Sequence, residues 1–231
     1  MAAGADVAIG LDVGQRVDPT AIVVAESVQR ETGRIIHSDA YHREHLQCGP
    51  APHCRYETET QFIAHSIGRL PLGTSYPQVA VEVANVVEGL NAQGIEPTLR
   101  VDATGVGQPL VDILRDGLLA KRYRLVEVVF TGGDHLEGGA RSRVRVPKWL
   151  LVSRLQALIQ TQRIRLPRSP EAKALARELE TFEVRISETA AITGGAFRTG
   201  SHDDLVVALG LAVLLDPTAY MAYFAPSPLR W

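Results

Sequence analysis

The stretch "DVAIGLDVG", residues 6–14, is typical of a short buried strand that ends in a glycine turn. Two stretches rich in β-branched residues follow it closely, "TAIVVAESV" at 20–28 and "GRIIHSDAYHRE" at 33–44. Asp18 and Pro19 supply turn chemistry between the first two stretches. Three strands with such short connections predict an antiparallel meander.

Helical and extended patterns alternate through the rest of the chain. We expect helices near 57–68 and 79–93, a strand at 98–102, a helix at 105–119, a strand at 123–130, helices at 148–161 and 170–180, and a hairpin before a final helix. This order places helices on the faces of a mixed sheet. The predicted fold class is α/β, a ribonuclease-H-like mixed five-stranded sheet flanked by helices with an additional β-hairpin, although several folds share this outline.

The composition indicates one soluble globular domain. The chain of 231 residues has a net charge of -2, which argues against a surface wholly built for nucleic acid. Residues 141–170 differ, because they contain eight Lys or Arg and no Asp or Glu. The apolar run Leu205–Leu215 is shorter than the roughly 20 residues that span a bilayer. With no secretory signal and only two cysteines, we expect a cytoplasmic protein without a membrane segment.

Four carboxylates stand at the ends of predicted elements. Asp12 ends the first strand, Asp102 ends the strand at 98–102, and Asp203 and Asp204 begin the final helix. Each alone has a structural explanation, as a strand-to-turn residue, a helix cap or a helix start. Neighbouring strand ends lie about 5 Å apart per strand. Carboxylates that converge there repel one another, and a hard divalent cation relieves the repulsion. Together they predict a metal site.

Several separate blocks of the chain carry a family resemblance. They occur in order as "GLDVGQRVDPTAIVVAE", "VDATGVGQPLVDIL", "VVFTGG", "VPKWLLVSRLQALIQTQRIRLP" and "GSHDDLVVALGLAVLL". These blocks resemble the nuclease domain of phage large terminase subunits. The resemblance implies a ribonuclease-H-like fold related to Holliday-junction resolvases, and cleavage of concatemeric duplex DNA with two Mg²⁺ or Mn²⁺ ions. It also implies that Asp12, Asp102 and one or both of Asp203 and Asp204 are the catalytic metal ligands.

The resemblance also implies partners and a domain layout. Large terminases act in the host cytoplasm with a portal protein, a small terminase subunit and an ATPase motor. The sequence contains no G-x-x-x-x-G-K-[ST] motif, so we expect either a nuclease fragment or a stand-alone relative. We expect a nuclease domain at 1–216, with an insertion at about 44–78, and a C-terminal tail at 217–231 that packs back on the domain or docks to the portal.

Basic residues supply candidates for DNA binding. Arg141, Arg143 and Arg145 alternate, so they project from one side of an extended segment, either toward a DNA backbone or into solvent. Lys148 begins the next helix, where it is either a contact to the scissile phosphate or a solvated lysine. His202 is a candidate for proton transfer or phosphate contact, although its helical position favours packing. No element suggests base readout, so we expect cleavage with little sequence specificity.

Two ions about 3.5–4 Å apart serve both the attacking and the leaving oxygen of a phosphodiester, and Asp12 is the candidate to bridge them. Other functions remain open. "GLDVG" also begins sugar kinases and actin-like ATPases, which bind nucleotide phosphates but need two such domains. A docking module with residual nuclease activity is a third interpretation. The His and Cys residues between 42 and 54 lack the usual zinc spacing, which favours ordinary loop residues.

Overall fold

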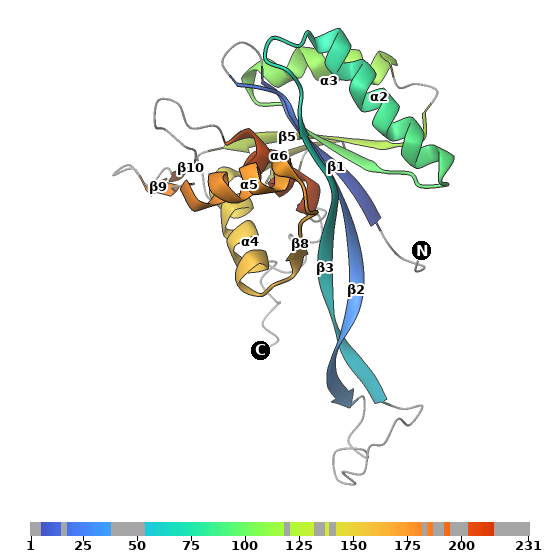
Figure 1. Ribbon diagram of the computed structural model, residues 1–231, viewed down its shortest axis with the longest axis vertical. Helices are drawn as coiled ribbons and strands as arrows, with labels where there is room; N and C mark the ends of the chain where they lie inside the picture. The colour runs from blue at the N-terminus through green and yellow to red at the C-terminus, as the bar shows by residue number, and fades with distance from the viewer. Residues whose placement is uncertain are drawn as a thin grey trace, which may run out of the picture.

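The computed structural model describes residues 6–14, 18–37, 54–117, 121–131, 137–138, 142–181, 184–186, 192–194 and 203–214. Within these ranges an eight-stranded sheet has the order β6-β7-β5-β4-β1-β2-β3-β8, and β9 and β10 form a separate two-stranded sheet (Figure 1). The strands are β1 (Asp6–Asp12), β2 (Ala21–His37), β3 (Cys54–Arg69), β4 (Thr98–Asp102), β5 (Arg124–Thr131), β6 (Glu137–Gly138), β7 (Arg143–Pro147), β8 (Ile164–Arg165), β9 (Val184–Ile186) and β10 (Ile192–Gly194). The helices are α2 (Tyr76–Ala92), the short 3₁₀ helix η1 (Gly105–Gly107), α3 (Gln108–Gly117), α4 (Lys148–Gln160), α5 (Pro170–Thr181) and α6 (Asp204–Val213).

Helices cover both faces of the sheet, and β1 lies between them. The alternating residues Val7, Ile9 and Leu11 face one apolar cluster, which they share with α2 and α3. The opposite face packs against α4, α5 and α6. Because successive side chains of a strand point to opposite faces, a short apolar strand such as β1 serves both layers.

Helix α6 is buried along its whole length, from Asp204 to Val213. It approaches β1 so closely that a Cβ atom on Gly10 would lie 2.0 Å from the backbone oxygen of Ala208. The buried carboxyl end of α6 receives side-chain donors: Arg100 Nη1 bonds the oxygen of Ala212 at 3.1 Å, and Arg154 Nε bonds the oxygen of Val213 at 2.8 Å. Two cations thus satisfy carbonyl groups that the helix itself leaves unpaired.

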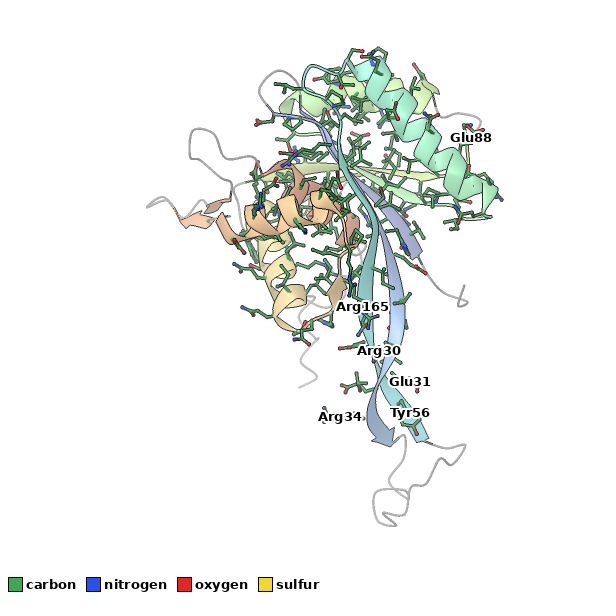
Figure 2. All side chains as sticks on the ribbon, in the orientation of Figure 1. Arg30, Glu31, Arg34, Tyr56, Glu88 and Arg165 are labelled. Carbon is green, nitrogen blue, oxygen red and sulfur yellow. The ribbon has the colours of Figure 1, made fainter. Side chains whose placement is uncertain are left out.

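Strands β2 and β3 continue beyond the helices as a two-stranded ribbon. Figure 2 shows Arg30, Glu31, Arg34 and Tyr56 on this ribbon, away from the helical layers. β1 pairs with β2 from Asp12 opposite Ala21 to Asp6 opposite Ser27. The ribbon therefore extends past the amino end of β1, away from Asp12.

The α/β class is confirmed, and the structure corrects three details. The prediction of a helix at 57–68 is wrong, because these residues belong to β3, which pairs with β2 along most of its length. The predicted strand at 33–44 is not separate, since its residues up to His37 continue β2. The predicted strands at 6–14, 20–28, 98–102 and 123–130 correspond to β1, β2, β4 and β5, whereas β3, β6, β7 and β8 add to the sheet without having been predicted.

The domain boundaries at 1–216 and 217–231 stay a prediction. Within the interval 44–78, residues 54–69 form β3 and residue 76 begins α2, while residues 44–53 and the tail lie outside the described residues. None of the helices that the structure describes is long and apolar enough to cross a membrane.

Candidate metal centre

Asp12 and Asp102 stand next to each other at the ends of two parallel strands. β1 and β4 pair in a register that places Leu11 beside Val101, and in each strand the next residue is the aspartate. Both residues are partly buried. One edge of the sheet thus presents two carboxylates in neighbouring positions, as the sequence predicted.

The turn after β4 holds Asp102 in place. The backbone N–H of Thr104 donates to Asp102 Oδ1 at 2.8 Å, and Thr104 Oγ1 accepts from the N–H of Phe130 at 2.9 Å. A Cβ atom on Gly107 would lie 1.9 Å from the backbone oxygen of Asp102. A side chain at position 107 would therefore displace the end of β4. This close contact explains why a glycine is required at this position.

Asp203 and Lys148 bring two helix starts together. Asp203 is the N-cap residue of α6, but its side chain makes no capping hydrogen bond. Lys148 is the first residue of α4, and its Nζ lies 3.3 Å from Asp203 Oδ2. Both side chains are partly exposed. The ammonium group therefore neutralises a carboxylate that remains accessible from solvent.

Asp204 has a different environment, because Arg69 holds it. Arg69 Nε lies 2.5 Å from Asp204 Oδ2, and Arg69 Nη2 bonds Asp204 Oδ1 at 3.2 Å. The same Nη2 also pairs with Glu178 Oε1. Arg69 ends β3 opposite Ala21, which in turn lies opposite Asp12, so the register brings the arginine to the same edge of the sheet.

The carboxylates act on one another electrostatically. Burial raises the pKa of Asp12 well above its ordinary value, and the charges of Asp102, Asp203 and Asp204 raise it further. Burial also raises the pKa of Asp102, and the charge of Asp203 adds to this effect, while the hydrogen bonds from Thr104 lower it. The positive charge of Lys148 lowers the pKa of both Asp12 and Asp102. These effects show that the four aspartates and Lys148 form one electrostatic cluster.

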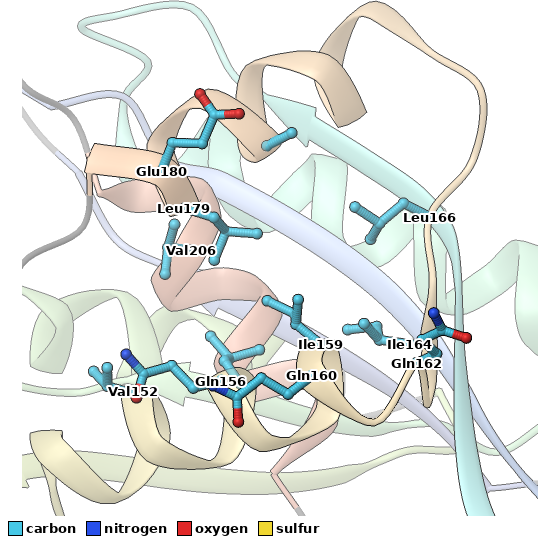
Figure 3. Close-up of a pocket in the computed structure, with 12 residues that line it drawn as sticks. Val152, Gln156, Ile159, Gln160, Gln162, Ile164, Leu166, Leu179, Glu180 and Val206 are labelled. Carbon is cyan, nitrogen blue, oxygen red and sulfur yellow. The ribbon is translucent and has the colours of Figure 1, made fainter.

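A large apolar pocket lies elsewhere in the molecule. It has a volume of about 580 Å³ and is lined by residues of α4, α5, β8 and the segments that flank β8, together with Val206 of α6 (Figure 3). Its apolar lining includes Val152, Ile159, Leu166 and Leu179. None of the four clustered aspartates lines it, so the candidate chemistry belongs to the sheet edge and not to this pocket.

Solved structures share the fold described above, although neither a protein family nor a curated protein matches the sequence. The nuclease domain of the large terminase subunit of bacterial virus Sf6, a variant with manganese and β-thujaplicinol, aligns with a TM-score of 0.56 and 11% identity over 91% of this chain and 88% of that one. The large terminase nuclease of thermophilic phage G20c, with bound magnesium, aligns with a TM-score of 0.53 and 16% identity over 91% and 82%. This chain has the large terminase nuclease fold. At such low identity the likeness establishes the fold alone.

A divalent cation matches the donor chemistry of this carboxylate cluster. Carboxylate oxygens are the ligands that Mg²⁺ and Mn²⁺ prefer. A cation would offset the burial and the neighbouring negative charges that together raise the pKa of Asp12. Among the residues that the structure describes, no three Asp, Glu, His or Cys side chains are already placed to share one ion. Lys148 and Arg69 hold two of the carboxylates, so a cation would compete with Lys148 for Asp203.

The other predicted site residues have different positions. Lys148 joins the carboxylate cluster. Arg143 and Arg145 are exposed on β7, where Arg143 Nε lies 3.9 Å from Glu127 Oε2, a buried carboxylate that also pairs with Arg115. Arg141 and His202 lie outside the described residues. The structure therefore supports a site role most directly for Lys148.

Sequence reasoning missed Arg69, Glu178 and Thr104. Thr104 follows Asp102 by two residues, and the preference of aspartate for bonding the backbone N–H two positions later is a signal that the sequence contains. Arg69 and Glu178 had no such signal, because they come from segments far from Asp204 in the sequence. The predicted helix at 57–68 also hid the position of Arg69 at the end of a strand.

The stability of the metal-free protein should depend on pH through Asp12 and Asp102. Their pKa values are raised in the folded state, so the folded state binds more protons than the unfolded state between the ordinary and the raised values. The free energy of unfolding therefore falls as pH rises through this window. The difference in melting temperature between Asp12→Asn and the wild type, measured in EDTA, should grow over the same pH range. A difference that does not change with pH would contradict the raised pKa of Asp12.

Proposed function

We propose that this chain is a divalent-metal-dependent endonuclease that cleaves duplex DNA, and that it serves as the nuclease of a phage packaging terminase. The observation that carries the proposal is the convergence of Asp12, Asp102, Asp203 and Asp204 with Lys148 at one edge of a sheet that has the large terminase nuclease fold. Fold likeness alone is compatible with many activities. The acidic cluster adds the chemistry that phosphodiester hydrolysis requires.

Asp12, Asp102 and the Asp203–Asp204 pair would hold the metal, either Mg²⁺ or Mn²⁺, and we propose two ions. The G20c nuclease contains magnesium and the Sf6 domain contains manganese, which supports this choice. When bound, the metal supplies an activated water and neutralises charge on the phosphate and the leaving oxygen. Asp12 is the central residue of the set, because the charges of Asp102, Asp203 and Asp204 all act on its carboxylate.

The protein's own side chains prepare the site for an anionic substrate. Lys148 is the positive charge that pairs with the exposed carboxylate of Asp203, and its partial exposure leaves it accessible to a phosphate. The Nζ of Lys148 would be available to a phosphate oxygen once Asp203 no longer pairs with it. The hydrogen bond from Thr104 keeps Asp102 directed toward the cluster.

Exposed arginines on β7 are the proposed DNA contacts. Arg143 and Arg145 alternate along the strand that leads directly into Lys148, so a DNA backbone that reaches Lys148 also passes near β7. Such contacts bind phosphates and carry no sequence information. We therefore propose cleavage with little sequence specificity.

The packaging context is a further part of the proposal. We infer that the chain acts in the host cytoplasm during phage assembly with a portal protein, a small terminase subunit and an ATPase motor. The likeness to large terminase nuclease domains supports this context. A nuclease fold retained only for docking is the remaining alternative, whereas the fold comparison disfavours a sugar kinase or actin-like ATPase.

Plasmid cleavage tests the proposed function. Supercoiled DNA incubated with the protein and Mn²⁺ or Mg²⁺ should be nicked and linearised, and EDTA should prevent this. Asp12→Ala should be inactive, whereas Asp116→Asn, an exposed aspartate on α3, should cut at the wild-type rate. Intact plasmid with the wild-type protein and Mn²⁺ would favour the docking module, and equal cleavage by Asp12→Ala would indicate a contaminating nuclease.

Charge reversal on β7 tests the proposed DNA contacts. Arg143→Glu combined with Arg145→Glu should weaken DNA binding, and it should reduce the slope of log affinity against log salt by about 0.9 for each lost phosphate contact. Mn²⁺ affinity, measured by calorimetry, should not change. Arg122→Glu, an exposed arginine just before the amino end of β5, is the control. An unchanged salt slope in the double variant would show that neither arginine contacts the DNA backbone.

A further inference from the structure

The two adjacent aspartates at the start of α6 have opposite environments. The side chain of Asp204 is 2% exposed, and both of its oxygens accept hydrogen bonds from Arg69. The side chain of Asp203 is 29% exposed and pairs with Lys148 Nζ at 3.3 Å. One carboxylate is thus fixed inside the protein, and its neighbour faces the acidic cluster.

Glu178 completes a closed network around Asp204. Its Oε1 pairs with Arg69, and its Oε2 accepts the backbone N–H of Leu205 at 3.2 Å. Arg69, Glu178 and Asp204 belong to β3, α5 and α6, so the network ties β3 and α5 to the first turn of α6. The arginine fork matches two carboxylates in a fixed geometry, which a flexible lysine would not reproduce.

Glu178 also accepts a hydrogen bond that an N-cap side chain usually accepts. An aspartate at this position normally accepts an N–H from the first helical turn. Asp203 makes no such bond, and the N–H of Leu205 bonds Glu178 instead. The carboxylate of Asp203 is consequently not used to cap α6.

We propose that Arg69 and Glu178 are positioning residues of the metal centre, which hold Asp204 as a structural anchor and thereby leave Asp203 as the cation-binding member of the pair. This inference rests on the proposed metal-dependent function. Removing one partner from a buried ion pair leaves an uncompensated charge, so Asp204 has a strong reason to stay with Arg69. Asp203 loses only a partly exposed contact to Lys148 when a cation binds it.

Mn²⁺ affinity, measured by calorimetry on the full chain, tests the division of roles. Changes at residues that orient ligands typically cost about 10–100-fold in metal affinity. We expect losses in this range for Glu178→Gln and Asp204→Asn, and a larger loss for Asp203→Asn. Glu180→Gln, an exposed glutamate on the same helix, should bind Mn²⁺ like the wild type. Urea unfolding of each variant identifies any that fail to fold.

A double-mutant cycle then separates an anchor from a ligand. The effects of Arg69→Met and Asp204→Asn on Mn²⁺ affinity should be strongly non-additive, because either change breaks the same pair. Arg69→Lys should recover part of the affinity that Arg69→Met loses. Equal losses in Asp203→Asn and Asp204→Asn, or tighter Mn²⁺ binding in Arg69→Met, would overturn the inference. A wild-type protein that neither binds Mn²⁺ nor cuts DNA would instead overturn the proposed function.

Discussion

Replacing Asp12 with asparagine is expected to abolish metal-dependent DNA cleavage and to raise the melting temperature of the metal-free protein. The amide keeps the shape of the side chain but removes the charge that Asp102, Asp203 and Asp204 repel. One unit of pKa elevation corresponds to about 1.4 kcal/mol of stability at pH values above the raised pKa. For a protein of this size, about 1 kcal/mol changes the melting temperature by roughly 2–4 °C. Plasmid cleavage with Mn²⁺ and thermal unfolding in EDTA measure the two effects.

Asp102→Asn should also abolish cleavage but stabilise less, because Asp102 accepts a hydrogen bond from Thr104 that favours its charged form. Asp116→Asn should change neither quantity. The opposite pattern, in which Asp12→Asn destabilises the protein and retains activity, would mean that Asp12 is a structural residue of the strand end.

Gly10→Ala is expected to cause the largest loss of stability among single changes in the sheet. The added Cβ atom would lie 2.0 Å from the backbone oxygen of Ala208 and 2.6 Å from the backbone nitrogen of Ala212. Backbone atoms of a buried helix cannot rotate away, so α6 must shift as a unit. We expect a cost of about 3 kcal/mol, and a decrease in melting temperature of roughly 6–12 °C. Cleavage should fall as well, because α6 carries Asp203 and Asp204.

Gly68→Ala is the matched control. Gly68 also lies in a strand of the main sheet, but no heavy atom lies within 4 Å of the position that its Cβ would occupy. This change should leave the melting temperature nearly the same or raise it slightly, because alanine restricts the unfolded chain. Equal destabilisation by both changes would show that loss of glycine flexibility matters more than contact with α6.

The sequence was sufficient to predict the elements whose patterns are strong. The alternating residues of β1, the long periodic face of α2 and the apolar run of α6 each appear where the patterns indicated. The helix prediction for residues 57–68 was wrong because "ETETQFIAHSIG" includes good helix formers and alternates between polar and apolar residues only briefly. Pairing with β2 over almost the whole of β3 outweighs that local preference.

The four aspartates and Lys148 of the candidate site were named from the sequence, whereas Arg69 and Glu178 were not. Strand ends and a helix start are marked in the sequence, so Asp12, Asp102, Asp203 and Asp204 could be placed together before any contact was known. The position of Arg69 at the site depends on the register of β3 against β2, and the position of Glu178 depends on how α5 packs on α6. These are tertiary relations between distant segments, and no local pattern encodes them.

The acidic cluster draws on the first strand, a middle strand and the last described helix of the chain, and this has a consequence for folding. Bringing such distant segments together is the slow part of folding in α/β proteins. During synthesis, α6 leaves the ribosome after every other described element, so Asp203 and Asp204 join the sheet edge last. A partly made or partly folded chain therefore lacks the complete acidic cluster. The nuclease we propose would become able to cut DNA only when its fold is finished.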